Sequence, residues 1–305
     1  MPAPVRISGQ LYIELTLSHG ISWDRMLPFT VSANPNWLYL TPSLRGTLDM
    51  TRSLIEDRQG LGFIMGDVGM GKSTVLRFLH NEYSTQEDDF ATTLVTLANY
   101  PSPFAFLRKI CGDFGLPAKR SLSLQQEAFE PFLVEQYTAG RTVVVFLDEG
   151  QLMTDEVLEV LRGLLNFETA EAKLIQIVVA AQLDLRDRLL MKRNKAIKSR
   201  IFAPCLVRPL SAEETAGMIT FRCDRAGVVN PFDSSGMERV YQLTEGVPRS
   251  IVIVCAHAYK AARRAGLDRV SADFIERAGE TLSLPSSQLA AARALPGSNH
   301  ESATA

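Results

Sequence analysis

The residues with the clearest chemical potential form one short run, Gly66-Asp67-Val68-Gly69-Met70-Gly71-Lys72-Ser73, followed by Thr74. The run matches G-x-x-x-x-G-K-[ST], the pattern of a phosphate-binding P-loop. Its glycines let backbone N–H groups turn toward phosphate oxygens, and the start of a following helix adds partial positive charge. Lys72 is expected to reach the β- and γ-phosphates of a nucleotide, and the Ser73 hydroxyl to ligate Mg²⁺.

The flanks of this run decide between a true P-loop and a glycine-rich turn that matches by chance. The preceding Leu61–Met65 is short and apolar, as in a buried parallel strand. After the run, Val75, Leu76, Phe78 and Leu79 follow a helical spacing. A strand before the loop and a helix after it are what the motif requires, so we favour the P-loop.

A pair of carboxylates follows a second apolar run. Val143–Leu147 reads as a buried strand, and Asp148 and Glu149 stand at its end. In this Walker B arrangement Asp148 would hold Mg²⁺, directly or through water, and Glu149 would polarise the water that attacks the γ-phosphate. The alternative is an ordinary strand end that enters a turn. The position of the pair after a P-loop favours the catalytic interpretation.

Two further polar residues are candidates for the same site. Gln182 ends the next apolar run, where it would lie beside the preceding strand ends and orient the attacking water; alternatively it is a solvent-facing residue that opens a helix. Arg249, after Gly246-Val247-Pro248, begins a helix in a region without strands. It would sense the γ-phosphate, or else it simply belongs to a surface helix start.

A basic segment covers residues 192–201. Arg200 would act as a finger that stabilises transition-state charge in a neighbouring subunit. The same segment would also suit nucleic-acid phosphates, and as a third alternative it is a solvated helix face. The candidates for DNA contact are Lys119, Arg120, Lys192, Arg193 and Lys195.

The elements that position these residues alternate between strands and helices. Strands are expected at 61–65, 92–97, 142–147 and 173–180, and a short strand or extended arm at 11–17. Helices are expected to begin at Ser43, Ser102, Thr154 and Ser211. This order predicts an α/β fold, a parallel sheet with helices on both faces in three layers. We expect an N-terminal arm at 1–25, a nucleotide-binding domain at 26–208, a helical lid at 209–282 and a flexible tail at 283–305.

Composition narrows the class of protein. A hydrophobic fraction of 46% with 22% charged residues is ordinary for a globular protein, and a net charge of −2 gives no global basic field for nucleic acid or membrane. The four cysteines are widely spaced and predict buried, reduced thiols rather than a metal site. We find no signal pattern and no apolar run of membrane-spanning length, which favours a cytoplasmic protein without a membrane segment.

Taken in order, the P-loop, the Asp-Glu pair, the polar strand end and the helical lid resemble AAA+ ATPases. Within them the chain resembles the ExeA/GspA-type clade, which includes secretion ATPases and the TniB/TnsC-type and Mu-type ATPases of DNA transposition. The resemblance rests on Pro28-Phe29, Asn34-Pro35, Leu38-Tyr39-Leu40, Pro42-Ser43, Leu161–Glu168 and Pro209–Glu214. The family often has Ala after Asp-Glu, and Gly150 stands there instead, a change expected to matter little.

The resemblance implies ATP as the nucleotide, Mg²⁺ as its ion, and a homo-oligomeric ring or filament whose active site is shared between subunits. By position, Gln182 matches sensor 1, Arg249 matches sensor 2, and Arg200 is the best finger candidate, ahead of Arg186 and Arg188. The side chains implied to wall the adenine pocket are Phe29, Leu38 and Tyr39.

We therefore expect an ATPase that assembles on double-stranded DNA and regulates a transposase or selects its target. The secretion members carry a membrane span and a cell-wall-binding domain after the lid, and this sequence stops there, which favours the transposition branch. One alternative is a secretion or envelope-assembly motor that acts on proteins. Another is a nucleotide-gated scaffold with little turnover.

Overall fold

The computed structural model describes residues 27–282, and these divide into two compact units. Residues 33–208 form the α/β unit, and residues 27–32 together with 209–282 form the helical unit. The segment 27–32 therefore groups with the helices and not with the nucleotide-binding domain in which we expected it. The predicted arm at 1–25, with its expected strand at 11–17, and the predicted tail at 283–305 lie outside the described residues.

A parallel five-stranded sheet forms the centre of the α/β unit, in the order β2-β3-β4-β1-β5. The predicted α/β fold is thereby confirmed. The register places Phe63 of β1 opposite Val179 of β4, and Val145 of β3 opposite Ile177. The strands are β1 (Leu61–Met65), β2 (Phe90–Val95), β3 (Thr142–Leu147), β4 (Ile175–Ala181) and β5 (Ile201–Leu206).

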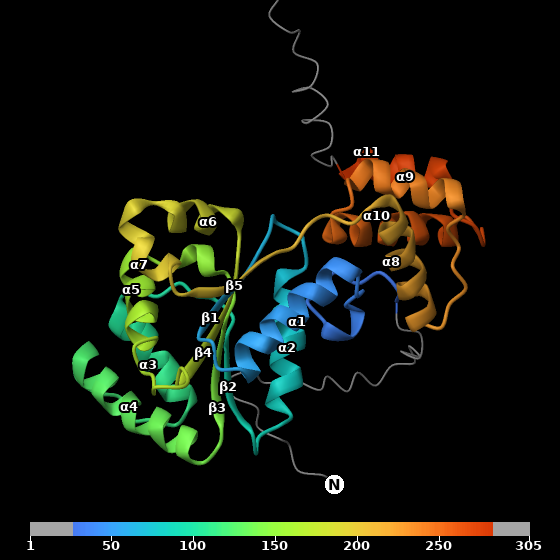
Figure 1. The fold of residues 1–305 in the computed structure, drawn as a ribbon. Helices are drawn as coiled ribbons and strands as arrows, with labels where there is room; N and C mark the ends of the chain where they lie inside the picture. Colours follow the sequence, from blue (N-terminus) through green and yellow to red (C-terminus); the bar gives the residue numbers. More distant parts are fainter. Residues whose placement is uncertain (1–26, 283–305) are drawn as a thin grey trace, which may run out of the picture. The chain divides into compact units, whose positions relative to one another are not determined.

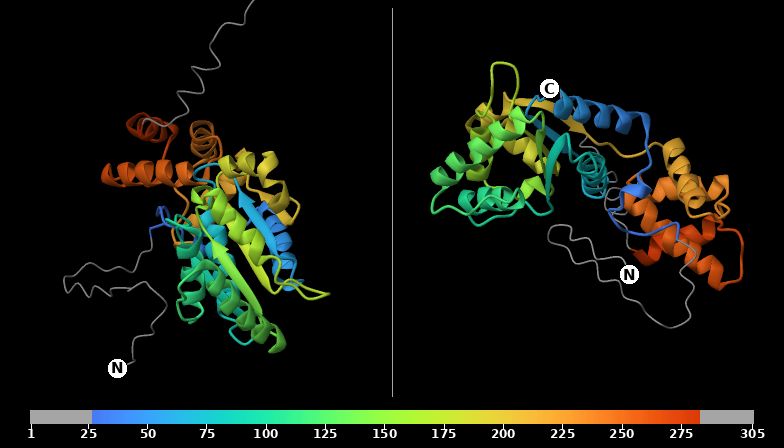
Figure 2. Two further views of the ribbon diagram at one scale, coloured as in Figure 1. Left: turned by 90° about the vertical axis from the view of Figure 1, so that its left-hand side faces the viewer. Right: turned by 90° about the horizontal axis from the view of Figure 1, so that it is seen from below.

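Helices cover both faces of this sheet (Figures 1 and 2). One face carries α1 (Pro42–Glu56) and α2 (Lys72–Ser84). The opposite face carries α3 (Pro103–Asp113), α4 (Leu122–Thr138), α5 (Asp155–Leu164), α6 (Leu183–Leu190) and α7 (Lys195–Lys198). Single 3₁₀ turns η1 (Pro35–Trp37), η2 (Gly150–Leu152) and η3 (Lys192–Asn194) complete the unit.

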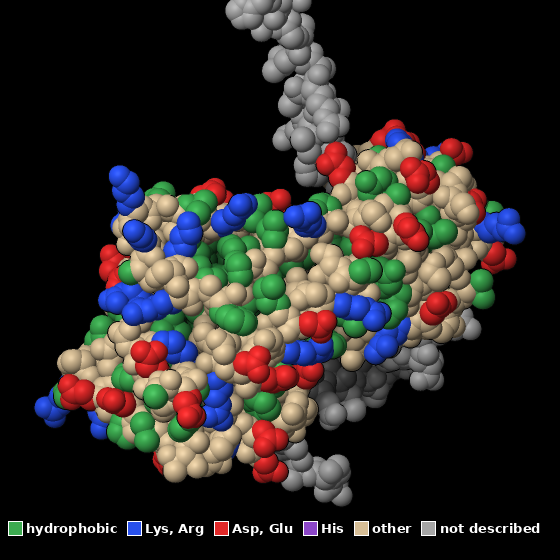
Figure 3. All heavy atoms as spheres, in the orientation of Figure 1, with side chains coloured by type: hydrophobic (Ala, Val, Ile, Leu, Met, Phe, Trp, Pro, Cys, Tyr) green, Lys and Arg blue, Asp and Glu red, His purple; other side chains and the backbone are tan. Residues whose placement is uncertain are grey.

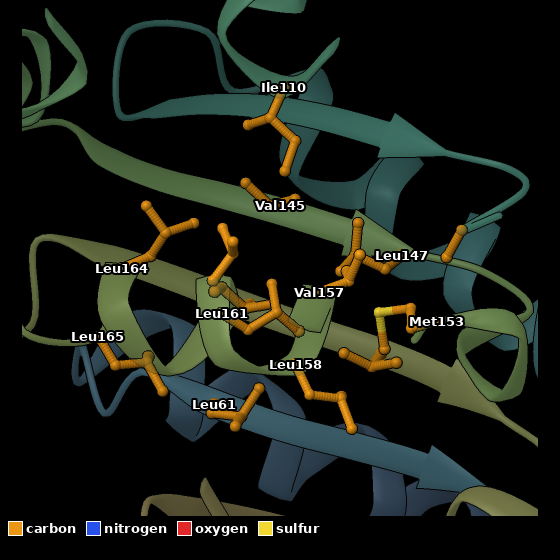
Figure 4. Close-up of a cluster of buried hydrophobic side chains, with 14 of the residues drawn as sticks. Leu61, Ile110, Val145, Leu147, Met153, Val157, Leu158, Leu161, Leu164 and Leu165 are labelled. Carbon is orange, nitrogen blue, oxygen red and sulfur yellow. The ribbon is translucent and has the colours of Figure 1, made fainter. Parts of the chain in front are cut away.

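Successive residues of the strands enter opposite hydrophobic layers, because side chains alternate across a strand. Val143, Val145 and Leu147 join the core beneath α5, whereas Val144 and Phe146 join the core beneath α2. Figure 4 shows leucines of α5 packed over the strands on the first of these faces. Burial on both faces explains why these strands are continuously apolar in sequence.

Most predicted helix starts are confirmed by their caps. The side chains of Ser102 and Thr154 accept hydrogen bonds from the first turns of α3 and α5, and Ser211 forms a capping box with Glu214. The predicted start at Ser43 is wrong by two residues. Thr41 is the cap of α1 instead, because Pro42 occupies the first helical position, where its missing N–H costs nothing.

The strand β5 was not predicted from the sequence. Among residues 27–282 it pairs only with β1 and is thus an edge strand, where Pro204 is tolerated because an edge strand does not need every N–H. Ala203 and Cys205 are buried, while Phe202, Pro204 and Leu206 alternate with them and are exposed. The proline and the short length concealed a strand whose alternation is otherwise clear.

The helical unit contains α8 (Ala212–Arg225), α9 (Ser234–Thr244), α10 (Pro248–Arg264) and α11 (Ala272–Leu282). Segment 27–32 packs into this unit through Phe29, whose ring meets those of Phe232 and Tyr259 at 5.6 and 6.2 Å. The buried guanidinium of Arg222 donates to the carbonyl oxygens of Pro28 at 3.2 Å and Thr30 at 3.5 Å. Burial lowers the pKa of Arg222 to about 10, which leaves it charged at neutral pH.

The sequence expectation about the cysteine side chains is confirmed. Cys111, Cys205, Cys223 and Cys255 are free and buried, as predicted. Among the helices of residues 27–282, none combines the length and the apolar character that a membrane crossing requires.

The close packing of Gly150 against β4 corrects one expectation. A β-carbon at this position would lie 2.4 Å from Cγ1 of Val179 and 3.3 Å from the carbonyl oxygen of Ala180. Alanine is therefore not equivalent to glycine here, because Val179 fills the space that a methyl group would need.

We predict that Gly150→Ala lowers the free energy of unfolding by about 1–3 kcal/mol, the usual cost of overpacking. The combination with Val179→Ala should recover part of this loss, which a double-mutant cycle in chemical denaturation would measure. Gly46→Ala is the matched control: nothing lies within 4 Å of the added atom, and alanine favours the helix α1. A Gly150→Ala variant as stable as the Gly46→Ala variant would contradict this packing.

We also predict that Arg222→Met loosens segment 27–32. Methionine keeps the aliphatic packing but leaves two carbonyl groups without a charged donor, a loss of about 1.5–3 kcal/mol. Hydrogen–deuterium exchange of residues 27–32 should accelerate. Arg225→Met, an exposed position on the same helix, should leave that exchange unchanged. Equal exchange in the two variants would show that Arg222 does not anchor the segment.

Candidate functional site

The P-loop spans the turn between β1 and α2, as the sequence predicts. Gly66 must lack a side chain because a β-carbon there would lie 2.8 Å from the carbonyl oxygen of Val207. Gly71 precedes α2 with φ 84°, a left-handed conformation that glycine adopts without strain. Because Gly71 offers no capping side chain, the first turn of α2 is open to an anion, which the helix dipole attracts.

Lys72 lies across this loop, in the first turn of α2. Its Nζ donates to the carbonyl oxygen of Asp67 at 2.8 Å, so the side chain folds over the P-loop itself. Burial lowers the pKa of Lys72, and the nearby carboxylates of Glu149, Asp148 and Asp67 oppose that effect. The ammonium group is therefore held between the loop and the Walker B carboxylates, where a phosphate group would meet it.

The contact between Ser73 and Asp148 joins the two halves of the site. The Ser73 hydroxyl donates to Oδ1 of Asp148 at 3.1 Å, although the residues are 75 positions apart. The same carboxylate oxygen accepts from the backbone N–H of Glu149 at 2.9 Å. Burial raises the pKa of Asp148, and these two hydrogen bonds oppose the rise.

The donor set at this contact suits Mg²⁺. A hydroxyl and a carboxylate supply the oxygen ligands that Mg²⁺ prefers, and the remaining positions of an octahedral ion are usually filled by phosphates and water. A carboxylate as buried as that of Asp148 also gains from a nearby cation. The residues present therefore fit the ion implied by the sequence.

Glu149 follows Asp148 in an unusual backbone conformation, with φ 55° and ψ 39°. A left-handed conformation is uncommon for a residue with a side chain and often marks a functional position. The Glu149 carboxylate accepts a hydrogen bond from the side-chain amide of Gln151. Gln182 lies at the end of β4, between the ends of β3 and β1, and its backbone N–H donates to Oε1 of Gln151 at 3.1 Å.

Gln151 is the residue that sequence reasoning missed. It connects Glu149 with Gln182, and Arg188 holds it from the other side by donating to its carbonyl oxygen at 3.1 Å. Arg188 also pairs with Asp155 at 2.7 Å. One feature of the sequence could have identified Gln151: it is a polar residue two positions after Glu149, close enough for a turn to bring its side chain back to the Glu149 carboxylate.

The other predicted arginines are placed differently. Arg200 lies just before β5 and donates to the carbonyl oxygen of Arg162 at 3.3 Å, while Arg186 is exposed on α6. Arg188 is engaged within its own unit, which disfavours it as a finger. Arg249 occupies the first turn of α10 in the helical unit. Its role as a sensor stays a prediction.

The residues implied for the adenine pocket fall in different units. Leu38 and Tyr39 are half-buried in the α/β unit, just before α1, whereas Phe29 is buried among the aromatic side chains of the helical unit. Their shared contact with adenine stays a prediction. The candidates for DNA contact are all exposed in the α/β unit: Lys119, Arg120, Lys192, Arg193 and Lys195. Of these, Arg193 pairs with Asp155 at 2.9 Å.

One curated protein is similar to this chain in sequence. The chain is 32% identical over 248 residues to the general secretion pathway protein A of Aeromonas hydrophila, covering 80% of this chain and 44% of that protein. The chain thus spans less than half of that relative's length.

Solved structures show the fold. The Drosophila ORC bound to DNA aligns with a TM-score of 0.61 at 18% identity, covering 96% of this chain and 74% of that one. The Aeropyrum pernix ORC1 protein in complex with DNA aligns with a TM-score of 0.59 at 15% identity, covering 86% and 70%. The ORC2 protein of the same organism, in ADPNP–ADP complexes, aligns with a TM-score of 0.57 at 17% identity, covering 80% of this chain and 71% of that one.

The family comparison agrees with both results. Residues 55–189 match the model of the AAA domain, and this range contains the P-loop, the Asp-Glu pair and Gln182. From its sheet order, its P-loop and these similarities, the chain has the P-loop α/β fold of AAA+ proteins, with an AAA domain over residues 55–189.

Proposed function

We propose that this protein is a Mg²⁺-dependent ATPase that assembles on duplex DNA and there controls a transposase. The hydrolytic part is supported above all by the contact between Ser73 and Asp148, because it brings together a hydroxyl and a carboxylate that suit Mg²⁺, next in the chain to Lys72 and Glu149. The same residue types in this arrangement bind and cleave nucleoside triphosphates in other P-loop proteins.

Each residue has a defined part in the proposed reaction. The P-loop N–H groups and Lys72 would bind the phosphates, and Ser73 and Asp148 would hold Mg²⁺, which would supply positive charge to neutralise the phosphates. Glu149 accepts the proton of the water that attacks the γ-phosphorus. The bond to the β–γ bridging oxygen breaks, and ADP and inorganic phosphate are released. Gln182 and Arg249 would orient the water and the γ-phosphate.

Assembly and DNA binding are supported by the surface of the α/β unit. Lys and Arg side chains gather over α6 and α7 in Figure 3, and Lys192, Lys195 and Lys198 are exposed there. Exposed hydrophobic side chains on neighbouring segments are typical of a protein interface: Leu190, Met191, Phe202 and Leu206. Two solved structures of similar fold are DNA complexes, which favours DNA as the partner.

A second candidate function is a secretion or envelope-assembly motor with protein partners. It is favoured by the 32% identity to a general secretion pathway protein. The two candidates share the ATPase site and differ in the macromolecule that the assembled protein binds. The transposase assignment rests on the resemblance of the chain to transposition ATPases, and binding to duplex DNA separates it from the alternative.

We predict that Glu149→Gln retains ATP binding but lowers hydrolysis about 100-fold or more, because the general base is lost. Lys72→Ala should lower the affinity for ATP itself, since the phosphate-binding cation is removed. Phosphate release and equilibrium binding of a fluorescent ATP analogue measure the two effects. Glu127→Gln, an exposed position on α4, is the matched control.

Two outcomes would count against the ATPase. One is hydrolysis by Glu149→Gln at the wild-type rate. The other is unchanged nucleotide affinity in Lys72→Ala. If wild type and Glu149→Gln bind ATP and assemble but are equally inactive, the protein is a nucleotide-gated scaffold instead.

We further predict that Lys192→Ala combined with Lys195→Ala weakens binding to duplex DNA in the presence of a slowly hydrolysed ATP analogue. The slope of log affinity against log salt should become shallower by about 2, because each phosphate contact contributes about 0.9. Arg108→Ala with Lys109→Ala removes two exposed charges from α3 and should leave the slope unchanged. Absent or salt-insensitive DNA binding would favour the secretion alternative.

A further inference from the structure

Both polar atoms of the Gln151 side-chain amide form hydrogen bonds. Its Nε2 donates to Oε2 of Glu149, and its Oε1 accepts from the backbone N–H of Gln182 at 3.1 Å. An amide has one accepting and one donating end, so the N–H of Gln182 fixes which end faces the carboxylate. The donor is thereby directed at Glu149, and the pair has a single orientation.

The backbone around Gln151 supports the same geometry. The left-handed conformation of Glu149 turns the chain so that a residue two positions later reaches back to its carboxylate. Gly150, between them, is pressed against β4, with no room for a side chain beside Val179. Arg188 holds the carbonyl oxygen of Gln151 and is itself fixed by Asp155. The turn η2 is therefore anchored to β4 and to α6.

The carboxylate that Gln151 holds lies on the phosphate-binding side of the site. Glu149 directly follows Asp148, whose carboxylate accepts the hydrogen bond from Ser73 in the first turn of α2. A flexible glutamate at a strand end would sample several rotamers, and only some would meet an attacking water. A hydrogen bond from a fixed amide restricts that freedom, which matters because small misplacements of a catalytic group are costly.

We infer that Gln151 is a positioning residue for hydrolysis, which fixes the carboxylate of Glu149 relative to the end of β4. This inference rests on the proposed ATPase function and extends it to a residue outside the P-loop, the Asp-Glu pair and the sensor positions. Gln151 acts through Glu149 and not on the nucleotide. Its loss should therefore change the chemical step and leave nucleotide binding intact.

The test is a double-mutant cycle between Gln151→Ala and Glu149→Gln. In single-turnover experiments, Gln151→Ala should lower the rate of hydrolysis about 10- to 100-fold, while the dissociation constant for ATP changes less than about 3-fold. In the Glu149→Gln background, the second substitution should have little further effect, since the group that Gln151 positions is already lost. Gln151→Glu replaces the amide donor by a second carboxylate, and it should lower the rate of hydrolysis at least as much as Gln151→Ala does.

A purely structural role for Gln151 gives a different result. It would lower thermal stability and would reduce activity by the same factor in both backgrounds. Gln86→Ala is the matched control, because Gln86 is exposed just after α2 and its amide donates to the carbonyl oxygen of Glu82 near the end of that helix. Thermal unfolding of every variant identifies any change that comes from misfolding.

The outcomes separate this inference from the ATPase proposal. If wild type hydrolyses ATP and Glu149→Gln does not, but Gln151→Ala is as active as wild type, the positioning role is wrong and the ATPase stands. Equal losses in both backgrounds, or a large change in ATP affinity, also overturn the positioning role. If wild type shows no hydrolysis, or Glu149→Gln is as active as wild type, both proposals fall together.

Discussion

The contact between the Ser73 hydroxyl and the Asp148 carboxylate is the interaction on which the site depends. It joins the start of α2 to the end of β3, and it exists only because β1 and β3 end at the same edge of one parallel sheet. Their separation by β4 in that sheet places Gln182 between them. The order of the strands thus determines which polar residues meet, and the hydrophobic layers on both faces hold that order in place.

Much of this arrangement could be predicted because local chemistry dictates it. The bounds of β1 and β3 follow from apolar runs that end in glycine or aspartate, and three helix starts follow from capping side chains. The resemblance to AAA+ proteins is supported by the AAA domain over 55–189 and by the fold, whereas its transposition branch remains a proposal. Where two capping residues competed, the presence of Pro42 favoured Thr41 over Ser43.

The remainder depended on tertiary contacts that a single sequence does not display. The strand β5 was missed because proline argues against strands unless the strand lies at an edge, and edge position is a property of the sheet. The sequence alone does not distinguish glycine from alanine at position 150, because the space for a methyl group is filled by Val179 of β4. Gln151 belongs to no motif that the sequence displays. Its side-chain amide gains importance from its hydrogen bonds to Glu149 and to Gln182, which is 31 residues away.

Hydrogen bonds from Arg222 hold segment 27–32 in the helical unit, and this determines how the chain connects that unit to the α/β unit. Within residues 27–282, the polypeptide passes between the two units after residue 32 and again after residue 208. A single covalent connection would leave one unit free to rotate about the connecting bonds in many directions. A second connection between the same two units adds a covalent constraint on such rotation. The covalent path of the chain therefore constrains the helical unit at both ends of residues 33–208.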